Sequence, residues 1–167
     1  PTAFFAVRNM SESLEEAGFV RLREEDHWEL KPGGAFYVTR NGSAVIAFRI
    51  PAGDPADLLG FQIMASHCDS PVFKVKTNAE ITVENRYVKL NVEKYGGALI
   101  APWLDRPLSV AGRVIVETEE GIETRLVNID RDLMIIPNLA IHMNRDANSG
   151  YAWNVQTDLL PLLCETG

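Results

Sequence analysis

Cysteine is scarce in this sequence, which contains only Cys68 and Cys164, far apart and without a CxxC pair. A disulfide framework, typical of small secreted proteins, needs several cysteines, so two distant thiols favour a reducing compartment. The sequence also begins without a basic stretch followed by a long apolar run, and no apolar run approaches the roughly 20 residues of a membrane helix. We therefore expect a cytoplasmic protein with no signal peptide and no membrane partner.

Basic residues are in the minority, with 16 Lys and Arg against 23 Asp and Glu, which gives a net charge of -7. Binding to nucleic acid depends on a basic surface that neutralises phosphates, so we expect no nucleic-acid partner. The negative net charge would not attract an acidic substrate to the protein. Its recognition would depend on a local basic group.

Complete catalytic motifs are absent from the sequence as well. It contains no HExxH, no GxSxG and no cluster of Cys and His with zinc-finger spacing. Three glutamate pairs could in principle provide a general base: Glu15–Glu16, Glu24–Glu25 and Glu119–Glu120. They fall near the end of a predicted helix, before Trp28 and at a predicted hairpin tip, where we interpret them as solvated charge.

The first half of the sequence predicts a helix followed by strands, in a composition (46% hydrophobic, 23% charged) ordinary for a globular protein. Apolar residues spaced by three and four predict an amphipathic helix over residues 3–17, with Gly18 as its C-terminal stop. Asn41-Gly42 between two β-type runs, residues 36–40 and 44–50, predicts a hairpin. The apolar run FQIMAS, residues 61–66, predicts a buried strand. We expect an α/β portion with one helix and a mixed sheet.

From about residue 73 the pattern changes to long alternation of apolar and polar residues, with EEG at 119–121 as a hairpin tip. We predict two domains: residues 1–75 in an α/β domain and residues 76–167 in a β-rich insertion. A single continuous mixed domain is the alternative. The apolar ending LLPLLCETG is interpreted as a truncation or a processing boundary.

His67 is the strongest candidate for chemistry, in the segment SHCDSPVFKVK, residues 66–76. It directly follows the predicted strand, where open α/β sheets place their ligands. In extended chain, residues two apart share a face, so His67 and Asp69 should point the same way and Cys68 the opposite way. This arrangement suits a metal-ligand histidine oriented by a carboxylate. The alternative is a structural histidine at a strand end with Asp69 capping the next turn, and the spacing alone favours it.

His142 is the second candidate, in IPNLAIHMNR, where it alternates with Ile141 and Met143 on the polar face of a β-like run. An imidazole there could hold a substrate or stabilise an oxyanion, and a surface or interface histidine is the alternative. Asp105 and Arg106, in YGGALIAPWLDRPLSVAGRV, are predicted to form an ion pair with other chains or to position a loop rather than to do chemistry.

Four blocks in a fixed order resemble the aspartyl aminopeptidase family: GGAFYVTRNGSAVIAFRI, SHCDSPVFKVK, YGGALIAPWLDRPLSVAGRV, and IPNLAIHMNR followed by NVQTDLLPLL. The resemblance implies a zinc metallo-aminopeptidase that releases amino-terminal Asp or Glu from peptides. It implies two zinc ions per active site in an α/β catalytic domain, and a β-rich domain that builds dimers and a dodecamer.

The same resemblance gives three residues a role. It implies that His67 is a zinc ligand, that Asp69 is the carboxylate supporting this ligand, and that His142 contacts substrate in a neighbouring subunit's active site. Cys68 stands where the family more often has Thr, and we expect consequences for packing only.

The sequence departs from the family at its carboxyl end. The family's bridging Asp, Glu-Glu pair, further Asp and second His follow the β-rich domain and have no counterpart here. One imidazole binds zinc weakly, and no positioned general base is present, so we predict that the 167-residue chain alone is inactive although the intact protein is a hydrolase. The alternatives are a non-catalytic self-association module and a related dinuclear zinc aminopeptidase of different specificity. Cobalt or manganese would suit the same ligands.

Overall fold

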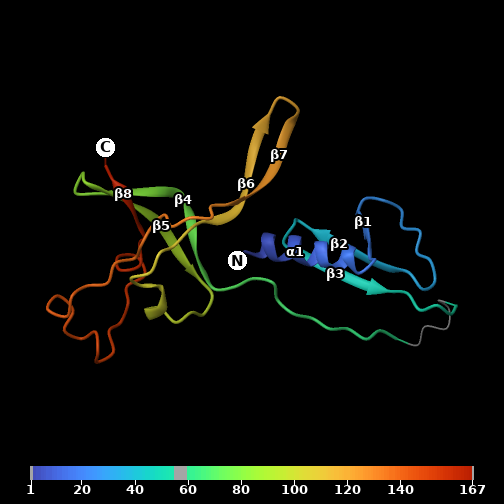
Figure 1. The fold of residues 1–167 in the computed structure, drawn as a ribbon, viewed down its shortest axis with the longest axis horizontal. Helices are drawn as coiled ribbons and strands as arrows, with labels where there is room; N and C mark the ends of the chain where they lie inside the picture. The colour runs from blue at the N-terminus through green and yellow to red at the C-terminus, as the bar shows by residue number, and fades with distance from the viewer. Residues whose placement is uncertain (1, 55–59, 167) are drawn as a thin grey trace. The chain divides into compact units, whose positions relative to one another are not determined.

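The structure is a computed structural model that describes residues 2–54 and 60–166. The chain divides into two compact units, Pro1–Ser70 with Ala111–Val127 and Pro71–Val110 with Asn128–Gly167. It therefore leaves the first unit after Ser70, returns to it for one hairpin, and leaves again (Figure 1). Over the described ranges, no helix combines the length and the apolar character needed to cross a bilayer.

The helix of the first unit, α1 (Ala3–Glu16), confirms the helix predicted from the apolar spacing. Its N-cap is Thr2, whose Oγ1 accepts a hydrogen bond from the Phe5 amide at 3.3 Å and so pairs one of the free N–H groups of the first turn. It ends before Gly18, whose φ of +81° is a backbone conformation that glycine adopts without strain.

Three strands form the sheet of this unit: β1 (Val20–Leu22), β2 (Ala35–Arg40) and β3 (Ala44–Arg49), in the order β1-β2-β3. β1 runs parallel to β2, and β2 pairs antiparallel with β3, so the sheet is mixed. Asn41 and Gly42 both have positive φ, as a type I′ turn requires, and the predicted hairpin is confirmed.

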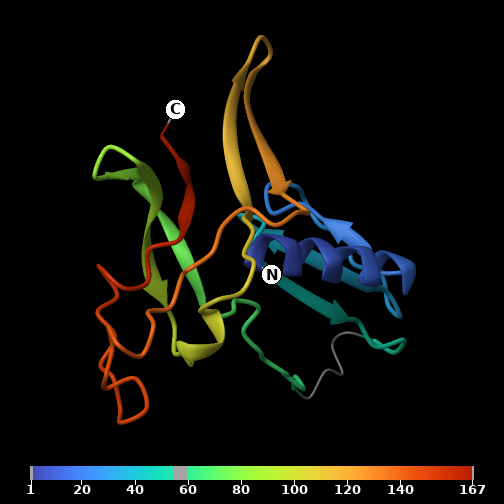
Figure 2. The same cartoon turned by 60° about the vertical axis from the view of Figure 1, so that its left-hand side comes forward.

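The helix lies along one face of this sheet (Figure 2). Tyr37, at the centre of β2, is fully buried, and its hydroxyl donates to the Glu15 carboxylate of α1. Burial raises the pKa of the Tyr37 hydroxyl, and the hydrogen bond to the Glu15 carboxylate raises it further. Glu15 therefore has a structural role in joining helix and sheet, beyond the solvated charge that the sequence predicted.

The buried strand predicted over residues 61–66 is wrong. The segment has no strand structure, and its apolar side chains face solvent, with Met64 99% exposed. A strand needs a hydrogen-bonded neighbour, and no strand of the described residues pairs with this segment. The apolar composition of residues 61–66 is therefore not enough to make them a strand.

The second unit contains β4 (Val72–Val83), β5 (Tyr87–Tyr95), a short 3-10 helix η2 (Ala101–Trp103) and β8 (Leu162–Glu165). The three strands form an antiparallel sheet in the order β4-β5-β8, with an irregularity in the β4–β5 register between Val75 and Glu80. One core cluster packs against this sheet and consists of Leu90, Val92, Met134 and Leu160. The β character predicted from the alternation is confirmed for this stretch.

The remaining strands, β6 (Ala111–Thr118) and β7 (Gly121–Asn128), form a two-stranded sheet. Their tip at Glu119–Glu120 is where the sequence predicted it. At the base, Arg113 Nη1 donates to the backbone oxygen and to Oδ1 of Asn41, both at 2.8 Å, and the guanidinium lies 4.3 Å from the Phe4 ring centre. One helix with mixed sheets confirms the α/β part of the predicted fold, while the division at residue 75 stays a prediction.

Candidate functional site

The structure brings His67 and Asp69 together in the first unit. The Nδ1 atom of His67 lies 3.1 Å from Asp69 Oδ1 and 2.9 Å from the Asp69 carbonyl oxygen. Both oxygens are acceptors, so this geometry selects the tautomer that carries its proton on Nδ1 and leaves the Nε2 lone pair available. The His67 side chain is 81% exposed, so Nε2 is accessible to a ligand from outside.

Cys68 points away from this pair, as the two-residue spacing predicted. Its Sγ donates to the carbonyl oxygen of Ser43, in the turn before β3, at 3.2 Å. Immediately afterwards the chain passes Pro71, against which Gly96 packs with a φ of +77°. A Cβ added to Gly96 would lie in ordinary van der Waals contact with Pro71, 3.4 Å from its Cα, so the positive φ and not the space favours glycine at this position.

A zinc ion fits these residues only in part. Zinc in proteins takes three or four protein ligands, of which neutral imidazole nitrogen is one of the commonest types. His67 offers one such nitrogen, and Asp69 fixes its tautomer in the way that carboxylates orient metal-bound histidines. Across residues 2–54 and 60–166, no group of three or more His, Cys, Asp or Glu is arranged to hold a metal. The described residues therefore offer one candidate ligand but no complete centre.

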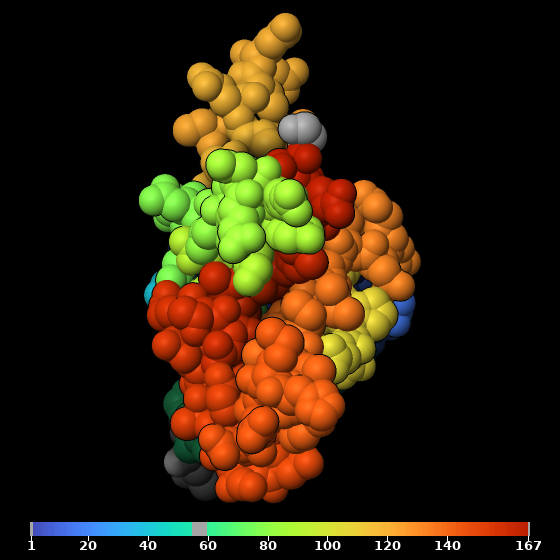
Figure 3. All heavy atoms as spheres, turned by 90° about the vertical axis from the view of Figure 1, so that its left-hand side faces the viewer, coloured from blue at the N-terminus to red at the C-terminus, as the bar shows by residue number. Residues whose placement is uncertain are grey.

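His142 lies in the second unit, in a turn and not in the β-like run that the alternation predicted. The amides of Met143 and Asn144 both donate to the Ala140 carbonyl, at 2.8 and 3.1 Å. These backbone groups are therefore paired within the turn, without hydrogen bonds to a neighbouring strand. His142 and its neighbours Ile141 and Met143 are exposed, whereas Asn144 is buried. Residues 140–150 lie at the surface of the face drawn in Figure 3, in orange.

Asp105 positions the segment that leads to His142. Its Oδ1 accepts a hydrogen bond from the Asn138 amide at 2.8 Å, and its own amide donates to the Ile136 carbonyl at 3.0 Å. The φ of Asp105 is +55°, a conformation that Asp and Asn tolerate better than most residues. Within the chain, Asp105 thus positions a loop, which is one of the two roles that the sequence left open. Arg106 instead donates to the Pro102 carbonyl at 3.2 Å.

The Asp105→Ala variant is expected to loosen this segment. Alanine removes the acceptor for the Asn138 amide and is strained at positive φ, so the free energy of unfolding should fall by about 1–2 kcal/mol. Amide hydrogen exchange of residues 138–144 should quicken beyond the effect of this global loss. Asp105→Asn keeps an acceptor and tolerates the backbone conformation, and serves as the matched control. Equal exchange rates in the two variants would show that Asp105 does not hold the segment.

A second carboxylate organises the loop after His142, although the sequence gave no reason to single it out. Asp158 Oδ2 accepts hydrogen bonds from the Tyr151 hydroxyl and from the Asn154 amide, each at 2.9 Å. The Asn154 amide is the main cause that lowers the pKa of Asp158, and the bond to Asp158 raises the pKa of Tyr151. The only signal in the sequence is the N-x-x-x-D spacing, typical of a local turn held by an Asp side chain.

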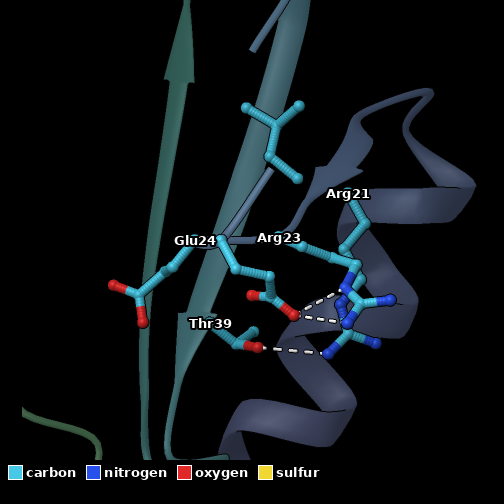
Figure 4. A pocket seen from close by; sticks show the side chains of 6 residues that line it. Arg21, Arg23, Glu24 and Thr39 are labelled. Atoms are coloured by element: carbon cyan, nitrogen blue, oxygen red, sulfur yellow. Dashed lines mark hydrogen bonds and ion pairs between the residues drawn. The ribbon is translucent and has the colours of Figure 1, made fainter. Parts of the chain in front are cut away.

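An open depression of about 580 Å³ lies beside β1 in the first unit, lined by Arg21, Arg23, Glu24, Glu25 and Thr39 among others (Figure 4). Arg23 pairs with Glu25 and thereby lowers the pKa of that carboxylate, and Arg21 donates to Thr39 Oγ1 at 3.2 Å. These charges are exposed and neutralise one another. The depression holds neither candidate histidine and no carboxylate poised as a base.

The sequence of this chain is similar to that of known proteins. The family model described as "Aminopeptidase I zinc metalloprotease (M18)" matches residues 1–166. A protein of Clostridium acetobutylicum named "Probable M18 family aminopeptidase 2" is 49% identical over 165 residues, which cover 98% of this chain and 38% of that protein. The chain thus spans less than two-fifths of the length of this relative.

Solved structures of other proteins also resemble this chain in fold. The cryo-EM structure of the Ape4 and Nbr1 complex contains a chain with a TM-score of 0.92 and 41% identity, covering 100% of this chain and 32% of that one. The mApe1 dodecamer of S. cerevisiae has a TM-score of 0.74 at 24% identity, covering 98% of this chain and 35% of that one, and shows the shared fold.

Proposed function

The chain belongs to the M18 family of zinc aminopeptidases, and from that premise we propose that it forms part of a metallo-aminopeptidase that releases amino-terminal Asp or Glu from peptides. The observation that carries the proposal is His67, whose side chain is 81% exposed and whose Nδ1 lies 3.1 Å from Asp69 Oδ1. This is the arrangement of a histidine prepared to bind a metal.

In this proposal His67 contributes one ligand to a centre of two zinc ions, and the remaining ligands come from polypeptide beyond the described residues. Bound zinc would polarise the scissile carbonyl and make water a nucleophile at neutral pH. Asp69 keeps the His67 proton on Nδ1 and so keeps the Nε2 lone pair available to a metal. Over residues 2–54 and 60–166 no group of His, Cys, Asp or Glu is arranged to complete a metal centre, which is why the 167-residue chain alone is proposed to be inactive.

His142 is proposed to contact substrate in the active site of a neighbouring subunit. Its exposed turn, flanked by the exposed apolar Ile141 and Met143, is suited to entering another protein surface. In a chain of net charge -7, an imidazole at that place would provide a local group able to bind an acidic side chain.

The assembly is proposed to be a homo-oligomer, a dimer that builds a dodecamer, located in the cytoplasm. A dodecamer is known for the mApe1 neighbour that shares this fold. In this proposal residues 76–167 belong to the β-rich domain that makes the subunit contacts.

The experiment that tests this function is an assay of the intact protein with zinc on peptides that differ only in their first residue. Peptides beginning with Asp or Glu should give a kcat/KM at least about tenfold above those beginning with Ala or Leu, because a site built for a carboxylate is left unpaired by an apolar residue. A chelator should abolish turnover, and the 167-residue chain, as control, should show none.

The self-association module is the competing function. It would assemble normally but show no zinc-dependent turnover on any of these peptides. Equal rates for acidic and apolar first residues would instead favour a dinuclear zinc aminopeptidase of another specificity.

A further inference from the structure

The turn between β2 and β3 contains Asn41-Gly42, the only Asn-Gly pair in the sequence. Both residues are exposed, and both have positive φ. In an Asn-Gly pair the backbone nitrogen of the glycine can attack the side-chain amide carbon of the asparagine, because the glycine has no side chain that blocks the approach. The turn is therefore a candidate site for this covalent change, which is called deamidation.

Deamidation uses water as its second reactant and needs no cofactor. The Gly42 nitrogen loses its proton and forms a bond to Asn41 Cγ, and the side-chain nitrogen leaves as ammonia. Water then opens the cyclic succinimide at either of its carbonyl groups. The product is aspartate or isoaspartate, and in isoaspartate the main chain runs through the side-chain carboxyl group. One water is consumed, one ammonia is released and the protein gains one negative charge.

The Gly42 nitrogen is free of other backbone bonds in the turn. The hydrogen bond that closes the turn runs from the Ser43 amide to the Arg40 carbonyl, at 3.1 Å. The Gly42 amide itself makes no hydrogen bond to another residue of the ranges 2–54 and 60–166. A Cβ built on Gly42 would meet no atom within 4 Å, so the space beside this residue is open. The nucleophile is thus accessible.

The Asn41 side chain, in contrast, is held by Arg113 of β6. Arg113 Nη1 donates to Oδ1 and to the backbone oxygen of Asn41, both at 2.8 Å. A guanidinium has donors only, so it fixes the amide with its oxygen toward Arg113. The Phe4 ring, whose centre lies 4.3 Å from the guanidinium, places Arg113 in turn.

This contact turns the two reacting atoms of the succinimide step away from each other. Both oxygens of Asn41 bond to the same nitrogen, so its backbone oxygen lies on the same side of the residue as its side chain. The Gly42 nitrogen is bonded to the same carbonyl carbon on the side opposite to that oxygen, and so it is turned away from Cγ. Ring closure therefore requires Asn41 to leave Arg113.

We propose that Asn41 is a deamidation site whose rate is set by its contact with Arg113. The reaction proceeds from the fraction of molecules in which Arg113 has released Asn41, so the observed rate is the intrinsic rate multiplied by that fraction. The hydrogen bond to Oδ1 also draws electrons from Cγ, but a carbon turned away from the nucleophile does not react.

The two products have different effects on the β6–β7 hairpin. Isoaspartate adds a methylene group to the main chain of the turn and displaces the carbonyl that Arg113 binds, so the base of the hairpin loses its attachment. Aspartate leaves the main chain unchanged and offers Arg113 a carboxylate, which accepts a stronger hydrogen bond than an amide does. Deamidation of Asn41 thus changes how the first unit holds this hairpin.

The Arg113→Ala variant of the intact protein tests the proposal. Both proteins are incubated at mildly alkaline pH and digested, and mass spectrometry follows the replacement of NH₂ by OH at Asn41. The rate should rise by at least about tenfold, because hydrogen bonds from a charged donor shift such an equilibrium by about that factor. Arg125→Ala removes the same charge from the same hairpin, where Arg125 bonds to Glu123, and should deamidate like the wild type.

Asn148, which is exposed and followed by Ser149, provides a reference in the same digest. Its rate should be equal in the wild type and in Arg113→Ala, whereas unfolding of the variant would quicken both sites. Adding Gly42→Ala to Arg113→Ala places a methyl group beside the attacking nitrogen and should slow Asn41 again. An unchanged or slower rate at Asn41 in Arg113→Ala would overturn the proposal, and so would an increase that Asn148 shares.

Discussion

Replacing His67 with alanine is expected to abolish the zinc-dependent peptidase activity of the intact protein, with kcat/KM reduced by about 10³-fold or more. In the proposed function the imidazole is the metal ligand that this chain contributes, and metal-bound water and carbonyl polarisation contribute several kcal/mol to the transition state. Zinc content, measured by atomic emission on dialysed protein, should fall in parallel. The fold should survive, because the side chain is exposed and packs against nothing in the core.

Two neighbours of His67 provide graded controls. Asp69→Asn weakens the acceptor that fixes the imidazole tautomer and should cost about 10- to 100-fold in zinc affinity or activity. Cys68→Ser keeps a donor toward the Ser43 carbonyl and should leave both quantities near wild type. The ligand assignment is refuted if the His67→Ala protein keeps its zinc and its turnover, and the orienting role of Asp69 is refuted if Cys68→Ser is the more damaging change.

The elements predictable from sequence are those decided by near neighbours in the chain. Thr2 and Gly18 bound α1, Asn41-Gly42 sets the β2–β3 turn, and Glu119–Glu120 marks the β6–β7 tip, each through interactions within a few residues. The His67–Asp69 pair belongs to the same class, since the two-residue spacing alone places both side chains together.

The features that escaped prediction depend on contacts between distant residues or on their absence. Residues 61–66 have the composition of a buried strand, but a ladder requires a neighbour that sequence pattern does not guarantee. The base of β6 is fixed by Arg113 and Asn41, 72 positions apart, which no local pattern reveals. The turn at His142 follows from its bonds to Ala140, which override the alternation of Ile141 and Met143.

His142→Ala is expected to lower kcat/KM of the intact protein by about 100-fold while zinc content stays at the wild-type level. The exposed imidazole is proposed to stabilise bound substrate or the developing oxyanion, and loss of one such donor costs about this much. His67→Ala and His142→Ala thus remove activity by different routes, and only the first should remove metal.

If His142 acts in a neighbouring subunit, the two inactive variants should complement each other. A subunit with His142→Ala keeps its own His67, and an adjacent His67→Ala subunit keeps the His142 that the first one needs. For dimers re-formed at random from equal amounts, half are mixed and one of their two sites is intact, so about one quarter of the wild-type activity should return. Activity that stays at the sum of the separate variants would place His142 in its own subunit's site or outside catalysis, because intact His67 and intact His142 would then have to reside in one chain.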